Sequence, residues 1–247
     1  MSDFPQVSVI MPVYNGAAFL PASLASIQRQ NQPGLELVLI DDGSTDNSAD
    51  VIRRLAPEAS YHYQENGGCS AARNTGLARA RAPLIAFLDM DDEWPEGNLR
   101  HLGAALQEHP QAMFALGRTR FLSRTNAPMP EPWVSTNLGA GLYRREVFAQ
   151  VGTFNPSRTL TDDVEWFIRA REKKVSYVTV EHVTLNYWRR PGSMTHGLDW
   201  GKTDLMATIR NSLARRRLAG GGQAAELNLL SGSKIDPRAS GAVKHEN

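Results

Sequence analysis

Short apolar runs alternate along the first half of the chain with segments in which apolar residues recur at helical spacing. The runs at residues 7–11, 35–40 and 84–88 are bounded by proline, glycine or acidic residues, which is typical of strands buried on both faces of a sheet. A weaker strand is expected at 61–64. Strands that alternate with helices predict a doubly wound, mostly parallel α/β sheet. The helices expected between the strands span about residues 19–27, 48–55, 70–81 and 99–109.

Acidic residues directly follow two of these strands. Asp41 and Asp42 end one, and Asp89, Asp91 and Asp92 follow the central one. In an extended chain Asp89 and Asp91 point the same way, and charges so close raise each other's pKa unless a cation neutralises them. Carboxylates suit Mg²⁺ or Mn²⁺, which complete their coordination with substrate phosphates. A solvated turn in which Asp92 caps the next helix explains this stretch alone equally well.

The carboxyl ends of the strands form the expected ligand site, because doubly wound sheets bind ligands there. Polar loops at 12–16, 41–44 and 89–92 converge on that edge. The first loop lacks the G-x-G-x-x-G pattern of nicotinamide enzymes, and no G-x-x-x-x-G-K-[ST] loop occurs. Phosphates are therefore expected at a metal rather than at a glycine loop. Arg73 could add a positive charge there, although an exposed helix arginine is the common alternative.

Composition narrows the class of protein. A formal charge of +1 over 247 residues gives no support for nucleic-acid binding, and no nucleic-acid motif occurs. The single cysteine, Cys69, excludes an internal disulfide and fits a reducing compartment. No signal peptide is visible, and no apolar run approaches the roughly 20 residues that span a bilayer. The expectation is a cytoplasmic protein that is soluble or at most rests on a membrane surface.

Four blocks of sequence together resemble the family 2 glycosyltransferases with a GT-A fold. They are VIMPVYN at 9–15, VLIDDGSTD at 38–46, NGG at 66–68 with AARNTGL at 71–77, and DMDD at 89–92. The resemblance implies transfer of a sugar, with inversion, from a nucleotide-sugar donor such as a UDP-sugar. The acceptor would be a hydroxyl of a glycan, a lipid-linked molecule or another compound. It also implies Mn²⁺ or Mg²⁺ as cofactor.

The resemblance also assigns roles to individual residues. Pro12 and Tyr14 would line the base pocket, Asp41 would accept a hydrogen bond from the base, and Arg73 would lie by the nucleotide. Asp91 and Asp92 would serve ribose and metal. The full implied nucleotide-binding set is Pro12, Val13, Tyr14, Asp41, Asp42, Gly68, Arg73, Asp89, Met90 and Asp91, and the implied metal ligands are Asp91 and Asp92.

The second half of the chain supplies the implied general base. The family usually has Glu-Asp where this chain has Asp162-Asp163, and Asp163 matches the base. The departure keeps a carboxylate at both positions. Taken without the family, the segment predicts a helix N-terminus with Thr161 or Asp162 as cap and Asp163 near the positive end of the helix dipole. Both interpretations can hold together.

A loop after the predicted strand at 183–188 resembles the family's segment over the donor diphosphate. Arg189 and Arg190 are the expected phosphate-facing charges. Pro191 stands where family members often have histidine. His196 could substitute as a metal ligand, although a solvent-facing histidine is the simpler interpretation.

The expected organisation is a single GT-A domain at 1–218 followed by a flexible tail at 219–247. Within it, 1–122 would bind the nucleotide sugar, 123–197 would hold the acceptor and the base, and 198–218 would form a C-terminal helix. That helix ends in three arginines, so it can pack on the domain or rest on an anionic membrane. The alternative function is a noncatalytic GT-A domain that binds nucleotide or scaffolds a partner enzyme.

Overall fold

A computed structural model describes residues 6–123, 129–158, 160–189 and 205–219. Its elements alternate between strand and helix through α4 and then become irregular. In chain order they are β1 (Val7–Val13), α1 (Leu20–Gln28), β2 (Glu36–Asp42), α2 (Ser48–Leu55), β3 (Ser60–Gln64), α3 (Cys69–Arg79), β4 (Leu84–Phe87), α4 (Asn98–Glu108), β5 (Phe114–Ser123), β6 (Trp133–Val134), the 3₁₀ turn η1 (Leu138–Ala140), β7 (Gly141–Arg144), α5 (Glu146–Val151), α6 (Asp162–Glu172), β8 (Tyr177–Arg189) and α7 (Leu205–Ala219).

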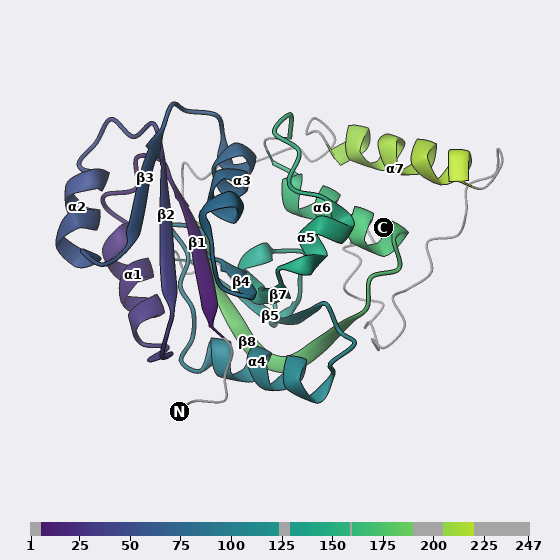
Figure 1. Cartoon of the computed structure of the whole chain (residues 1–247), viewed down its shortest axis with the longest axis horizontal. Helices are drawn as coiled ribbons and strands as arrows, with labels where there is room; N and C mark the ends of the chain where they lie inside the picture. Colours follow the sequence, from purple (N-terminus) through teal and green to yellow (C-terminus); the bar gives the residue numbers. More distant parts are fainter. Residues whose placement is uncertain (1–5, 124–128, 159, 190–204, 220–247) are drawn as a thin grey trace.

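The strands form one eight-stranded mixed sheet in the order β3-β2-β1-β4-β7-β5-β6, and β8 pairs with β5 (Figure 1). The first four strands pair in parallel, as do β5 and β8. Between them β7 runs antiparallel to both β4 and β5. Since β5 is therefore parallel to β4, the carboxyl ends of β1, β2, β4 and β8 lie at the same edge of the sheet. The predicted doubly wound, mostly parallel sheet is confirmed.

The sheet is buried on both faces because alternate residues of its strands pack against different helices. On β1, Val9 and Met11 belong to the apolar cluster that includes side chains of α1, α2 and α4. Ile10 belongs to the other cluster, with side chains of α3, α5 and α6. This two-sided burial explains why β1 and β4 are almost continuous apolar runs.

Several local predictions are corrected. Asp92 does not cap the next helix, since α4 begins at Asn98 after Gly97, whose φ of +75° suits glycine. The strand predicted at 183–188 is the end of the longer β8. The short strand β7 was not predicted from the sequence, although Leu142 and Tyr143 are fully buried in it.

The C-terminal helix is present as α7, and residues 198–204 and the predicted tail after Ala219 lie outside the described residues. Within the described ranges, no helix combines the length and the apolar character that crossing a membrane would require.

Candidate active site

The loops after β1 and β2 are joined by hydrogen bonds. The backbone N–H of Asn15 donates to Ser44 Oγ at 3.0 Å, and that of Gly16 donates to Ser48 Oγ at 2.8 Å. In return, Thr45 N–H donates to Asn15 Oδ1 at 2.8 Å. The two loops therefore form one surface at the carboxyl edge, as the strand-end argument predicted.

Tyr14 projects from this surface and is 48% exposed, whereas Pro12 and Val13 are buried in β1. The backbone N–H of Tyr14 lies 3.4 Å from the Met90 sulfur. A Cβ on Gly16 would lie 2.3 Å from the same sulfur, so glycine permits this close approach. The loop after β4 is thus packed against the loop after β1.

Asp41 is buried, and each of its carboxylate oxygens already accepts a hydrogen bond within the protein. The donors are Ser44 N–H at 2.8 Å and the Tyr61 hydroxyl at 2.7 Å. Burial and the Asp41 charge raise the pKa of Tyr61 to about 12, so the hydroxyl keeps its proton at neutral pH. A nucleobase that bonds Asp41 would have to use a further lone pair of these oxygens.

Asp42 positions the loop after β3. Its carboxylate accepts the backbone N–H groups of Gly67 at 2.9 Å and Gly68 at 2.8 Å, and the Gln64 amide at 2.7 Å. Gly68 has φ +83° and is the N-cap of α3. Asp42 therefore sets where α3 begins, and with it the position of Arg73 one turn further on.

Arg73 joins both halves of the site. Its guanidinium donates to Asp162 Oδ2 at 2.5 Å and to Asp89 Oδ1 at 2.7 Å, and its side chain is only 7% exposed. Ser70 Oγ donates to the same Asp162 oxygen at 3.1 Å. Burial alone would lower the pKa of Arg73, but the Asp89 and Asp162 charges outweigh it and hold that pKa well above its ordinary value. The alternative of an exposed helix arginine is wrong.

Asp163 follows the anchored Asp162 in the first turn of α6 and is partly buried. Burial raises the pKa of its carboxyl, and the Asp162 charge raises it further, to about 7. Arg73 opposes part of this increase. A carboxylate that titrates near neutral pH can accept a proton from a reacting group.

The helix N-terminus predicted for this segment is confirmed. Thr161 is the N-cap of α6 but makes no side-chain capping bond, and its hydroxyl lies 3.1 Å from that of Thr208 in α7. The Asp162 carboxylate accepts from Ser70 and Arg73. The first turn of α6 is therefore fixed by α3 and α7.

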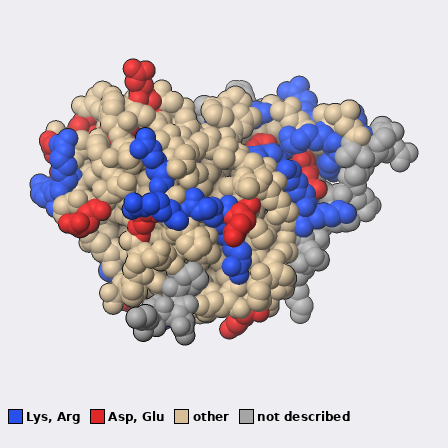
Figure 2. All heavy atoms as spheres, viewed as in Figure 1, with Lys and Arg blue, Asp and Glu red and all other residues tan. Residues whose placement is uncertain are grey.

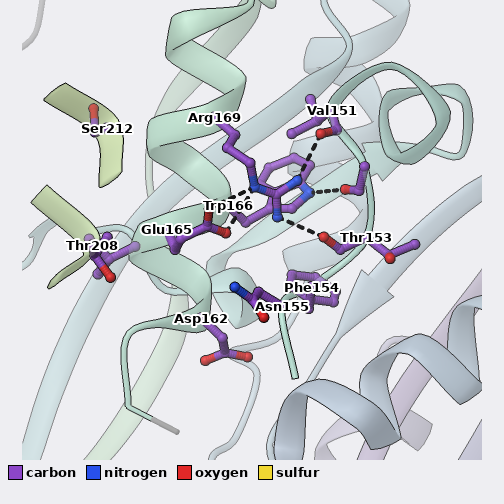
Figure 3. Close-up of polar contacts among 12 residues, drawn as sticks. Val151, Thr153, Phe154, Asn155, Asp162, Glu165, Trp166, Arg169, Thr208 and Ser212 are labelled. Carbon is purple, nitrogen blue, oxygen red and sulfur yellow. Dashed lines mark hydrogen bonds and ion pairs between the residues drawn. The ribbon is translucent and has the colours of Figure 1, made fainter. Parts of the chain in front are cut away.

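A second set of bonds fixes the rest of α6 (Figure 3). Arg169 donates to the Val151 carbonyl at 2.7 Å and the Thr153 carbonyl at 2.6 Å, and it also pairs with Glu165. Trp166 Nε1 donates to the carbonyl of Gly152 at 2.9 Å. These bonds of Arg169 and Trp166 were not predicted from the sequence. The only signal for them was the i,i+4 spacing of Glu165 and Arg169.

The segment at 151–154, whose carbonyls accept these bonds, is also bonded to α3. The Asn74 amide donates to the Phe154 carbonyl at 2.8 Å and accepts the Phe154 N–H at 2.9 Å. Asn74 follows Arg73 directly, so two consecutive residues of α3 make hydrogen bonds to the second half of the chain, at Phe154 and Asp162.

Asp92 is almost completely buried and accepts the backbone N–H of Trp188 at 3.1 Å. The Trp188 indole N–H donates to Glu93 at 2.9 Å. These bonds hold the end of β8 beside the β4 loop. The next residue, Arg189, is exposed, with its guanidinium 5.3 Å from the centre of the Phe121 ring. Arg190 and His196 lie outside the described residues.

The acidic residues after β4 could hold a divalent ion only together with oxygens of a bound substrate. Within the described ranges, no group of three or more His, Cys, Asp or Glu side chains is placed to hold a metal. Asp89 is paired with Arg73, and Asp92 is buried against Trp188, whereas Asp91 is partly exposed at the edge. Mg²⁺ is often held by one or two carboxylates and substrate phosphates, which Asp91 and a diphosphate could supply.

The mixed sheet with its site at the carboxyl edge is the GT-A glycosyltransferase fold. Staphylococcus aureus TarS, residues 1–349 in complex with UDP-GlcNAc, has a similar structure with a TM-score of 0.70. The two sequences are 19% identical, and the likeness covers 86% of this chain and 66% of that one. The model of glycosyl transferase family 2 matches residues 8–164, more than half of the 247 residues, and the chain belongs to that family.

Relatives in sequence carry the same description. An uncharacterised glycosyltransferase of Haemophilus influenzae is 38% identical over 112 residues, which cover 43% of this chain and 45% of that protein. A PGL/p-HBAD biosynthesis glycosyltransferase of Mycobacterium bovis is 29% identical over 204 residues, or 78% of this chain and 80% of that protein. Several relatives, the Haemophilus protein among them, are matched over less than half of their length.

Proposed function

We propose that the protein transfers a sugar from a nucleotide-sugar donor to an acceptor hydroxyl, with Asp163 as general base. The observation that carries the proposal is this carboxylate, whose pKa is about 7, held through Asp162 and Arg73 beside the strand-end loops of a family 2 fold. A UDP-sugar is the proposed donor, because TarS has been solved with UDP-GlcNAc and with UDP.

In this proposal the donor lies across the carboxyl edge. The exposed Tyr14 ring packs on the base, Asp41 and Asp42 order the loops around it, and Arg189 faces the diphosphate. The test is to incubate the protein with a panel of UDP-, GDP- and dTDP-sugars and to measure donor binding and donor hydrolysis separately. Turnover of one donor supports the proposal, and tight binding without turnover would favour a noncatalytic nucleotide-binding domain.

Asp91 is the proposed metal ligand. A bound Mg²⁺ or Mn²⁺ would stabilise the charge that develops on the leaving diphosphate. Asp91→Ala is expected to abolish the dependence of donor binding on added Mn²⁺, which calorimetric titration with and without EDTA measures. Asp92, the other metal ligand that the resemblance implies, accepts Trp188 N–H, so Asp92→Ala should lower the melting temperature. Equal donor turnover by the wild type in EDTA and in Mn²⁺ would refute the metal proposal.

The proposed stereochemistry is inversion by a single displacement. Asp163 takes the proton of the acceptor hydroxyl while the hydroxyl oxygen forms a bond to the anomeric carbon. At the same time the bond from that carbon to the diphosphate breaks, and its electron pair leaves with the diphosphate. An α-linked donor of gluco or galacto configuration should therefore give a β-linked product, with a large anomeric coupling constant in the proton NMR spectrum. A small coupling typical of an α-linkage would contradict this mechanism.

A further inference from the structure

The inner face of α7 is polar. Thr208 and Ser212 are its buried residues, and they contact Thr161 at 3.1 Å and Glu172 at 2.6 Å. One turn further on, Arg215 pairs with Glu172 at 2.7 Å. The helix is therefore attached to α6 by hydroxyl groups and an ion pair, which is the reverse of an ordinary surface helix that buries an apolar stripe.

Three apolar side chains of α7 are exposed instead. Met206 is 52% exposed, Ile209 is 39% exposed, and Leu218 in the last turn is 85% exposed. Across the described part of the chain only two other large hydrophobic residues, Tyr14 and Tyr63, are classed as exposed. Three of the five exposed large hydrophobic residues in the described part of the chain thus belong to one helix.

Positive charge accompanies these apolar side chains. Residues 205–219 contain four arginines and no acidic residue. Arg215 is turned toward Glu172, whereas Arg210 and Arg217 are exposed. At 100° per residue, both of these lie within about 40° of Met206 around the helix. Lys and Arg atoms gather over the end of the molecule that holds α6 and α7 (Figure 2).

We propose that one outer face of α7, made of Met206, Ile209, Arg210 and Arg217, which lie within about 100° of one another around the helix, docks on an anionic lipid bilayer. Apolar side chains flanked by arginines on an interfacial helix insert at the headgroup boundary, and the arginines attract anionic lipids. A single helix about 22 Å long, at 1.5 Å per residue, offers little area for a stable dimer. This small area argues against a second copy of the chain, and the exposed arginines favour an anionic lipid surface.

The position of α7 adds a consequence that rests on the proposed function. Because Thr208 contacts Thr161, two residues before Asp163, a docked α7 would bring the base close to the bilayer. An acceptor hydroxyl held at a membrane surface would then lie within reach of the site.

The test is co-sedimentation of the full chain with vesicles. Binding is expected to vesicles that contain phosphatidylglycerol and not to vesicles of phosphatidylcholine alone. Arg210→Glu combined with Arg217→Glu should weaken the vesicle partition coefficient at least tenfold, since one arginine near such a surface contributes about fivefold. Met206→Ser combined with Ile209→Ser should also weaken it severalfold. The control is Arg54→Glu, an exposed arginine of α2 at the other end of the molecule (Figure 1), which should bind as the wild type does.

The result that overturns the proposal is a wild type that does not sediment with phosphatidylglycerol vesicles, or α7 variants that bind as well as the wild type. Light scattering without vesicles tests the alternative occupant, a second copy of the chain. A wild-type dimer that dissociates in the Met206→Ser, Ile209→Ser variant would show that the outer face binds a second copy. The vesicle test needs no donor, so its outcome is independent of whether glycosyl transfer is found. All substituted side chains are exposed, and an unchanged melting temperature would show that each variant is folded.

Discussion

Asp163→Asn is expected to lower kcat by about 10²-fold or more, because asparagine has nearly the same shape but cannot accept the acceptor's proton. Donor binding should hardly change, since the side chain is proposed to act on the acceptor. The measurement is steady-state transfer with the donor identified by the nucleotide-sugar panel, together with calorimetric donor binding. The matched control is Asp50→Asn, the same substitution at an exposed position of α2, which should leave both unchanged.

The same residue should set the pH dependence. With its pKa at about 7, Asp163 is protonated and inactive as a base at pH 6, so wild-type kcat should rise as the pH increases through 7. The variant's residual rate should lack this step. Near-normal activity in Asp163→Asn would move the role of base to Asp162 or Glu165.

The contribution of Asp163 to the stability of the folded protein should decrease as the pH rises, whereas kcat should increase. The pKa of Asp163 is higher in the folded protein than the value of about 3.9 in an unfolded chain, so folding favours the protonated form. The associated stability is fully present below pH 3.9 and is lost as the pH rises through 7. Asp163→Asn should therefore raise the melting temperature at pH 8 and have little effect near pH 4. A melting temperature unchanged at pH 8 would contradict the raised pKa.

Arg73→Met is expected to lower the free energy of unfolding by about 3–5 kcal/mol, as found when one member of a buried ion pair is removed. The change leaves the carboxylate of Asp162 buried without its cation, since that side chain is only 8% exposed. Urea denaturation measures the effect. The control is Arg81→Met, because Arg81 is mostly exposed and its pair with Glu36 should contribute at most about 1 kcal/mol.

A double variant tests whether the loss comes from this pair. Asp162→Asn removes the stranded charge, so adding it to Arg73→Met should recover part of the stability, with a coupling of about 0.5–3 kcal/mol. Additive losses would mean that Arg73 and Asp162 stabilise the fold independently. Loss of transfer activity in the single variant is also expected, because the first turn of α6 would no longer be held.

The first four strands could be predicted because their sequence signal is local. The run at 84–88 is apolar at every position and the run at 7–11 at every position except Ser8, which follows from helices covering both faces of the sheet. The strand-end loops followed from the same signal, since parallel strands place their carboxyl ends together. The short strand β7 gave no comparable signal, because its pattern of Gly141 to Arg144 is also compatible with a loop.

The contacts that join the halves of the site could not be predicted in this way. Arg73 and Asp162 are 89 positions apart, and nothing in the periodicity around either residue shows that they meet. Asp92 shows the same limit. Its place among clustered acids made it a predicted metal ligand, and the hydrogen bond from Trp188 N–H to its carboxylate follows only from the path of β8.

The insertion of β7 between β4 and β5 has a consequence for synthesis of the chain. When residues up to Phe87 have emerged from a ribosome, β4 can pair with β1 on one side only, because its other neighbour is encoded more than 50 residues later. Until then the nascent protein has an apolar strand with an open edge, the kind of surface that associates with other strands. Residues 88–140 therefore mark the stage of translation at which chaperone binding should protect this protein most.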